Sequence, residues 1–445
     1  MPQLSSSTLS QLMLETSDRS RYCGCAIFTI SKTNMRQSRR LLVLLAVAAA
    51  YICLIDRVAI SVAIIPMVEA FGWRPSEQGA IMSAFFIGYV LLQLPAGWLS
   101  DRYGGKWVLG GGVLLWSLFT ALTPPAAATS LTVLIICRFL MGMAESVTWP
   151  AVYSLFAQWL PVSERGLALG LLNSSVSGGT IIALAVTPFL IELGGWQAVF
   201  YVYGGLGLLW ALWWLPSVPN APDSVVTADV AADSHPVVAD DLKPFTPAKV
   251  LRSRAVWVLA YAHFATNWIV FLSLAWLPTY FSRAFGLDIR AVGLLAVLPY
   301  LVSVLATPFF GRLADQWLRR GMNRTKLRRR MQVLALGGVG AVTMLVGYAE
   351  SIEVAIALFC VANFCVAASV GGFAANHMDI APNHSGTLYG ATNAMASFAS
   401  AGSVFVAGLV LEWTGSWVAV FQSAAAIALS GAIVYGLGAS TQREF

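Results

Sequence analysis

Residues 137–150 read Cys-Arg-Phe-Leu-Met-Gly-Met-Ala-Glu-Ser-Val-Thr-Trp-Pro and lie within a longer apolar run, residues 130–158. A run of this length predicts a membrane-spanning helix. Arg138 and Glu145 are about two helical turns apart within it, so they lie on one face. An ionised side chain at bilayer depth costs about 2.5–3.5 kcal/mol, so this face must border protein interior or a water-filled cavity. The two charges fit either a structural ion pair or a pathway for ions and substrate.

The rest of the chain is equally apolar. Of its 445 residues 58% are hydrophobic and 11% are charged, and the mean hydropathy is +0.72. This composition predicts an all-α membrane protein that crosses the bilayer many times. Twelve apolar segments have spanning length and are bounded by glycine, proline or charge; they are residues 41–67, 78–99, 106–124, 130–158, 165–192, 196–215, 254–283, 291–313, 331–349, 352–377, 386–412 and 417–438.

These segments divide the chain into two halves of six. We predict an N-terminal bundle over 41–215 and a C-terminal bundle over 254–438, joined by a cytoplasmic linker over 216–253. Residues 1–40 are predicted to be a disordered tail, or in part an over-extended start before Met35, and residues 439–445 a second tail; acidic residues in the first tail argue against a transit peptide. Basic residues gather in the first tail and after the even-numbered spans, which predicts that both termini are cytoplasmic.

Charge and cysteine content exclude several classes of protein. The formal charge is +6, but eight of the 27 basic residues lie in one connection, which indicates membrane orientation and not a nucleic-acid partner. The six cysteines follow no disulfide or metal pattern, and no hydrolase or nucleotide-binding motif is present. We therefore expect a monomer that is not an enzyme, holds no metal or cofactor, and draws energy from a proton gradient, with sodium as a second possibility.

A glycine–aspartate motif recurs at the same place in each half. Residues 97–106 read Gly-Trp-Leu-Ser-Asp-Arg-Tyr-Gly-Gly-Lys after the second span, and residues 311–315 read Gly-Arg-Leu-Ala-Asp after the eighth. Duplicated halves are typical of transporters that rock two bundles about a midplane site. The first motif resembles the loop signature of the major facilitator superfamily, which implies two pseudo-symmetric six-helix bundles. The resemblance also implies that Asp101 caps a helix and, with Arg102 and Asp315, latches the cytoplasmic side.

Two more charges lie in the first span, where Asp56 and Arg57 are adjacent. Neighbouring residues point about 100° apart on a helix, so one faces a cavity and the other a neighbouring helix. Arginine stays charged and offers a planar fork that grips a carboxylate or phosphate. A buried carboxylate beside arginine, such as Glu145 or Asp56, is suited to load and release a proton near neutral pH. An entering anion would compete with that carboxylate for the arginine, and this competition couples proton to substrate.

Uncharged polar residues complete the predicted site. Tyr89 and Asn393 lie mid-span with few polar neighbours, so we expect them to hydrogen-bond the substrate. Other intramembrane polar residues more often serve helix packing; they include Asn173, Ser174, Ser175, Ser177, Asn267, Ser369, Thr392 and Ser397. His377 and Asp379 end the tenth span, where helix capping is a better explanation than a proton relay.

Residues 371–393 read Gly-Gly-Phe-Ala-Ala-Asn-His-Met-Asp-Ile-Ala-Pro-Asn-His-Ser-Gly-Thr-Leu-Tyr-Gly-Ala-Thr-Asn and resemble the anion:cation symporter family. The Asp-Arg pair of the first span and residues 137–150 resemble that family too. The resemblance implies that Arg57 binds the substrate anion, and that Arg138 and Glu145 take part in substrate handling and proton coupling.

Together these features predict a proton-coupled symporter of a small organic anion, such as a sugar acid, that works by alternating access. The predicted substrate contacts are Arg57, Tyr89, Arg138 and Asn393, and the predicted proton carriers are Asp56 and Glu145. Sodium-driven phosphate transport and an anion sensor that does not transport are the alternatives. We expect the plasma membrane, or an organelle membrane if the source is eukaryotic.

Overall fold

The computed structural model describes residues 6–219, 247–382 and 384–444. All of the regular elements in these residues are helices, which confirms the predicted all-α class. The helices are α1 (Ser6–Phe71), α2 (Pro75–Tyr103), α3 (Gly105–Thr129), α4 (Leu131–Glu145), α5 (Thr148–Trp159), α6 (Val162–Ser217), α8 (Pro247–Arg252), α9 (Arg254–Phe285), α10 (Ile289–Arg319), α11 (Arg324–Val346), α12 (Ile352–Ala367), the 3₁₀ turn η2 (Ala368–Gly371), α13 (Phe373–Ile380), α14 (Ser385–Thr414) and α15 (Trp417–Gly438).

The helices account for the twelve predicted spans in different ways. Among the described residues, 9 helices are long and apolar enough to cross a membrane, and the bent helix α2 adds a tenth. Helix α6 is broken at Gly194 and Gly195, where Gly195 takes a φ of +73° that other residues rarely adopt, so α6 contains two predicted spans. Helix α11 contains the remaining one, and its first two turns are rich in Arg and Lys.

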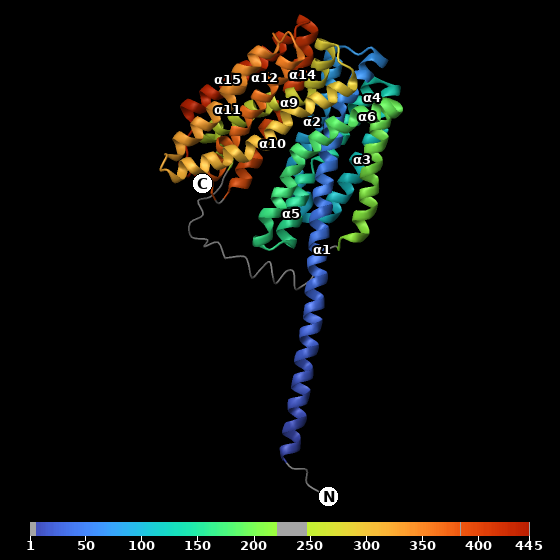
Figure 1. Ribbon diagram of the computed structural model, residues 1–445, viewed down its shortest axis with the longest axis vertical. Helices are drawn as coiled ribbons and strands as arrows, with labels where there is room; N and C mark the ends of the chain where they lie inside the picture. Colours follow the sequence, from blue (N-terminus) through green and yellow to red (C-terminus); the bar gives the residue numbers. More distant parts are fainter. Residues whose placement is uncertain (1–5, 220–246, 383, 445) are drawn as a thin grey trace.

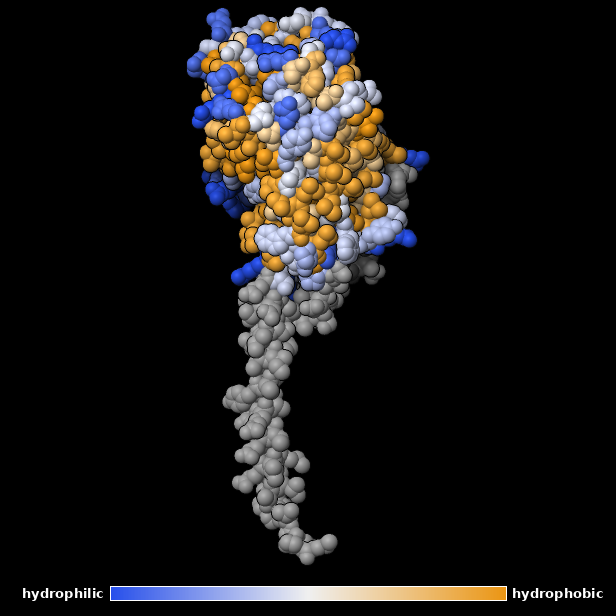
Figure 2. All heavy atoms as spheres, turned by 90° about the vertical axis from the view of Figure 1, so that its right-hand side faces the viewer, coloured by the Kyte–Doolittle hydropathy of each residue, from blue (hydrophilic) through white to orange (hydrophobic). Residues whose placement is uncertain are grey.

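The helices form two bundles that lie side by side (Figure 1). Helices α1–α6 pack together in one bundle, and helices α9–α15 pack together in the other. Contacts between α2 and α14, α1 and α9, and α6 and α10 join the bundles. On the face shown in Figure 2, hydrophobic residues form a belt between two hydrophilic ends, as expected for a protein embedded in a bilayer.

Small residues permit the close packing on which the first bundle depends. A Cβ atom added to Gly142 of α4 would overlap the backbone of Phe85, and one added to Gly88 of α2 would overlap the backbone of Phe139. Helices α2 and α4 therefore touch through their backbones at these glycines. This close approach brings the charged residues of α4 toward the side chains of α1 and α2.

The chain ends depart from the predicted boundaries. Helix α1 begins at Ser6 and continues without a break into the first span, and the only proline inside this helix is Pro66. Helix thus occupies residues 6–40, where a disordered tail was predicted. Most of the predicted linker, residues 220–246, lies outside the described residues. At the other end the chain folds back on α13, since the amide of Glu444 donates to the carbonyl of Ile380.

We call the end of the bundles that carries both chain termini the terminal face, and the opposite end the far face. The terminal face contains Tyr103, Arg319 and Ile380, where α2, α10 and α13 end. The far face contains Arg74 and Glu412, at the junction of α2 and α14.

Candidate functional site

A cavity of about 630 Å³ lies between the two bundles. Its wall includes Arg57 of α1, Tyr89 of α2 and Asn393 of α14, three of the residues that the sequence predicted to contact substrate. The other polar side chains in the wall are Gln93, Tyr153, Asn173, Ser177, Thr180, His263, Asn267, Tyr300, Ser303, Asn363, Tyr389, Ser397 and Ser400. The wall also includes Gly386, Tyr389 and Gly390 in the first turns of α14, so the cavity extends toward the terminal face.

The far face is closed by contacts between the bundles. Gln78 of α2 donates to the hydroxyl of Thr279 of α9 at 2.8 Å, and the amide of Ser76 donates to Glu412 of α14 at 3.0 Å. Arg74 lies 3.6 Å from the same carboxylate. A Cβ atom added to Gly408 would lie 2.5 Å from the carbonyl of Pro75, so α2 and α14 touch directly here. These contacts close the far face, so the cavity opens toward the terminal face.

Arg57 and Glu145 form an ion pair in the wall of the cavity. Both Nε and Nη2 of Arg57 approach Oε2 of Glu145, at 3.3 and 3.1 Å. The thiol of Cys53 donates to the same oxygen at 3.2 Å. The Glu145 side chain is fully buried, whereas that of Arg57 is 9% exposed. Since no described residue accepts from Nη1 of Arg57, this part of the guanidinium is available to a ligand in the cavity.

Aromatic rings frame the Arg57 guanidinium. Its central carbon lies 4.7 Å from the ring centre of Tyr89 and 5.1 Å from that of Phe85. Rings at this distance attract a cation through their electron-rich faces and hold the fork in one orientation. Tyr89 thus contacts Arg57 through its ring as well as bordering the cavity.

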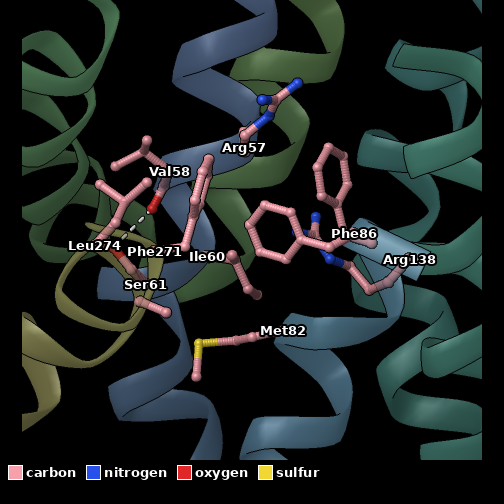
Figure 3. Close-up of a pocket in the computed structure, with 11 residues that line it drawn as sticks. Arg57, Val58, Ile60, Ser61, Met82, Phe86, Arg138, Phe271 and Leu274 are labelled. Carbon is pink, nitrogen blue, oxygen red and sulfur yellow. Dashed lines mark hydrogen bonds between the residues drawn. The ribbon is translucent and has the colours of Figure 1, made fainter. Parts of the chain in front are cut away.

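Arg138 lies apart from the main cavity. It borders a small cavity of about 20 Å³, room for about one water molecule, together with Arg57, Phe86 and Phe271 (Figure 3). Phe86 and Phe271 border both cavities, and their rings meet edge to face at 5.0 Å, so they separate Arg138 from the larger space. Arg138 donates to the sulfur of Met141 at 3.0 Å and stacks on Phe85.

Glu145 therefore pairs with Arg57 of α1, and the ion pair with Arg138 that the shared helix face allowed is not formed among the described residues. Two side chains of one helix two turns apart lie more than a salt-bridge length from each other unless both bend together. Arg57 on the neighbouring helix α1 reaches Glu145 at 3.1 Å instead.

Asp56 points away from the cavity, into the first bundle. Its side chain is 1% exposed, and neither carboxylate oxygen has a hydrogen-bond partner among the described residues. The predicted division holds, in that Arg57 faces the cavity and its neighbour faces other helices. Asp56 has no direct access to a ligand in this conformation.

The predicted gate residues lie at the terminal face without forming a latch. Asp101, Arg102 and Asp315 are exposed, and none of them makes an ion pair with a described residue. Arg102 instead stacks over the ring of Trp98 at 5.3 Å. The prediction that Asp101 caps a helix is wrong, because it lies inside the last turn of α2 and Gly104 is the residue that precedes α3.

Sequence reasoning missed several polar residues of the cavity wall, and His263 is the one with the most defined contacts. His263 of α9 borders the cavity and hydrogen-bonds Thr392 of α14, which also contacts His377 of α13. A lone histidine in an apolar span is a recognisable signal, but its partners come from segments more than a hundred residues away. No group of three His, Cys, Asp or Glu side chains in the described part of the chain could hold a metal ion.

Comparisons with known proteins agree with this fold. The profile of the Major Facilitator Superfamily matches residues 45–403 and 282–443. Among solved structures, a bacterial homologue of the human lysosomal transporter Spinster, in an inward-facing and occupied conformation, superposes with a TM-score of 0.74. It is 15% identical in sequence and covers 90% of this chain and 96% of its own, so it supports the fold.

Two relatives from Arabidopsis thaliana are similar over nearly the whole chain. "Sodium-dependent phosphate transport protein 1, chloroplastic" is 35% identical over 405 residues, which are 90% of this chain and 78% of the relative. "Ascorbate transporter, chloroplastic" is 36% identical over 413 residues, which are 91% of this chain and 75% of the relative. The predicted resemblance to anion transporters is thereby confirmed.

Proposed function

Because this chain belongs to the Major Facilitator Superfamily and is an anion transporter of that family, we propose that it carries a small organic anion together with protons. The anion binds Arg57 in the central cavity, with Tyr89 and Asn393 as hydrogen-bonding neighbours. Glu145 carries the proton. Rocking of the two bundles exposes the cavity to each side of the membrane in turn.

The observation that carries this proposal is the shared use of one guanidinium. Arg57 has one edge on the buried carboxylate of Glu145 and another edge toward the cavity. An anion that grips the fork weakens its pairing with Glu145, and an unpaired buried carboxylate is costly, so Glu145 then takes up a proton. Release of the anion restores the ion pair and expels the proton. Substrate and proton therefore move together.

The size of the cavity favours an organic substrate. Pockets for organic ligands span about 300–1,000 Å³ and combine apolar surface with a few polar groups. The cavity of about 630 Å³ falls in this range, and its wall mixes aromatic and aliphatic side chains with polar ones. An inorganic anion would leave most of this space to water.

The test uses purified protein in liposomes, with gluconate, ascorbate and inorganic phosphate as probes. On a pH gradient we expect the wild type to accumulate an organic probe. Glu145→Gln should abolish accumulation yet retain one-for-one exchange of the anion across the membrane, because a neutral amide cannot carry the proton. Glu164 is an exposed carboxylate at the start of α6, so Glu164→Gln is the matched control and should accumulate the organic probe as the wild type does.

If Glu145→Gln still accumulates the probe on a pH gradient, Glu145 is not the required proton carrier. Absence of exchange in the wild type would instead favour the sensor, since a sensor binds anions without moving them.

Sodium-driven phosphate transport is the second candidate, and the printed name of one relative favours it. It predicts phosphate uptake that depends on a sodium gradient and is insensitive to pH. The same liposomes distinguish the two candidates when the two gradients are imposed separately.

We also propose where the protein resides. Both relatives carry names that place them in chloroplasts, which favours a plastid membrane over the plasma membrane. The basic residues around the terminal face favour an orientation in which both termini lie on the more negative side. Fluorescent fusions at each terminus, combined with protease protection of isolated plastids, test both points.

A further inference from the structure

Two histidines and a threonine form a hydrogen-bonded chain in the part of the cavity wall made by α9, α13 and α14. His263 Nδ1 lies 3.1 Å from Thr392 Oγ1, and His377 Nε2 lies 2.8 Å from the same oxygen. His377 Nδ1 lies 3.0 Å from the carbonyl oxygen of Phe373. All three polar side chains are almost completely buried, and only the first of them borders the cavity among the described lining residues.

These contacts decide which ring nitrogen of His263 carries a proton. Burial without a described carboxylate partner favours neutral rings. A carbonyl oxygen only accepts, so His377 carries its proton on Nδ1 and its Nε2 is an acceptor. The Thr392 hydroxyl has one proton, which it donates either to His377 or to the carbonyl oxygen of Tyr389 at 3.1 Å, so in both cases it accepts from Nδ1 of His263. The Nε2 atom of His263 consequently has no proton and acts as an acceptor.

That acceptor is free to meet a ligand. No described residue donates to Nε2 of His263, and the side chain borders the cavity. Asn267 lies one helical turn further along α9, so it shares this face. Its Nδ2 donates to the carbonyl of Ala396 at 3.2 Å, which leaves its Oδ1 as a second acceptor toward the cavity. Helix α9 therefore presents two acceptors, while α1 presents the donors of Arg57.

We propose that His263 is a specificity-determining residue that accepts a hydrogen bond from a hydroxyl group of the transported anion. The inference rests on the proposed function and narrows the substrate to organic anions with hydroxyl groups remote from the charged end. The charged end contacts Arg57, and the hydroxyl groups contact His263 and Asn267 across the cavity. Thr392 and His377 are positioning residues, because they hold the His263 ring in the tautomer that accepts.

An anion with methyl or methylene groups in place of hydroxyls cannot satisfy these acceptors. Its binding leaves both acceptors desolvated and without a donor, which weakens affinity by about 2- to 10-fold for each neutral hydrogen bond lost. Hydroxylated anions are thereby preferred without any further charge in the wall.

The test compares gluconate with hexanoate, which have carbon chains of the same length and differ in their hydroxyl groups. Dissociation constants are measured for purified wild-type protein and for His263→Leu, Thr392→Val and Thr392→Ser. We expect the wild type to prefer gluconate, and His263→Leu and Thr392→Val to lose about 2- to 10-fold of that preference while hexanoate binding is kept. Thr392→Ser retains the hydroxyl and should restore it. Thr343→Val, a buried threonine of α11, is the matched control.

Two results overturn the inference. If His263→Leu still prefers gluconate over hexanoate as the wild type does, His263 does not contact the substrate. If Thr392→Val loses affinity for gluconate and hexanoate equally, the role of Thr392 is purely structural. Failure of the proposed function looks different, because the wild type would then bind inorganic phosphate and neither organic probe.

Discussion

The bundle of α1–α6 gives the cavity a charged wall, whereas the bundle of α9–α15 gives it an uncharged polar wall. The first wall has Arg57 at its surface and Glu145 directly behind it. The second wall includes His263, Asn267 and Asn393, and the residues described there include no Asp, Glu, Lys or Arg. The two halves thus share a helical architecture but differ in chemistry.

This difference follows from the cost of burying charge. An isolated ion at bilayer depth is expensive, and pairing it with an opposite charge in the same bundle offsets much of that cost. A pair confined to one bundle also survives rocking, because its members move together. Neutral hydrogen-bonding groups carry a smaller penalty, so they are suited to the opposite wall, where they distinguish one anion from another.

Arg57→Lys is expected to have the largest effect, because it alters the charged wall. A lysine keeps the charge but replaces the planar fork with a single ammonium, so it cannot contact Glu145 and a ligand in the same way. Loss of one charge-assisted hydrogen bond predicts an affinity about 10- to 100-fold lower for every anion tested. Titration of gluconate and phosphate, followed by intrinsic tryptophan fluorescence, provides the measurement.

Arg319→Lys at the exposed end of α10 is the control and should bind as the wild type does. An unchanged affinity in Arg57→Lys would remove Arg57 from the binding site, and with it the charged wall.

A change on the opposite wall should have a smaller and more selective effect. Asn393 borders the cavity, and its backbone carbonyl is occupied by Ser397 at 2.8 Å, so the side chain is the part left for a ligand. We expect Asn393→Ala to weaken gluconate by about 2- to 10-fold, the value of one neutral hydrogen bond, with little effect on phosphate. Gln158→Ala on the surface of α5 serves as control. Equal loss of affinity for gluconate and phosphate would mean that this wall does not distinguish one anion from another.

The sequence predicted the charged wall better than the uncharged one. Arg57 and Glu145 are conspicuous in apolar runs, because charge there is costly and requires a reason. The sequence predicted a carboxylate beside an arginine but left open whether it is Glu145 or Asp56, since that depends on how α1 and α4 are rotated and how deeply each is set. The helical class and the spans followed from hydropathy alone. The continuation of α1 through residues 6–40 did not, because a polar composition is compatible with either helix or coil.

The uncharged wall was harder to predict for a physical reason. His263 and Thr392 are separated by 129 residues, and each is an ordinary helix residue until the two lie 3.1 Å apart. Polar residues at such positions usually pack helices, so no single one stands out. The role of a neutral group depends on which of its atoms are already occupied, and only coordinates supply that.

The weakest expected effect concerns the far face, where the two bundles meet. Arg74 is 67% exposed and Glu412 is 27% exposed, and such pairs contribute about 0–1 kcal/mol. Glu412→Gln removes the charge but keeps an oxygen for the amide of Ser76, so anion exchange in liposomes should change by no more than about fivefold. High salt should erase the difference between Glu412→Gln and the wild type, because exposed charges are screened.

Glu77→Gln is the control variant, since Glu77 also contacts Arg74 but lies within α2 and does not bridge the bundles. If Glu412→Gln changes exchange far more than this, or if the change persists in high salt, charge across the bundles closes the far face. The close approach of Gly408 to Pro75 would then be secondary.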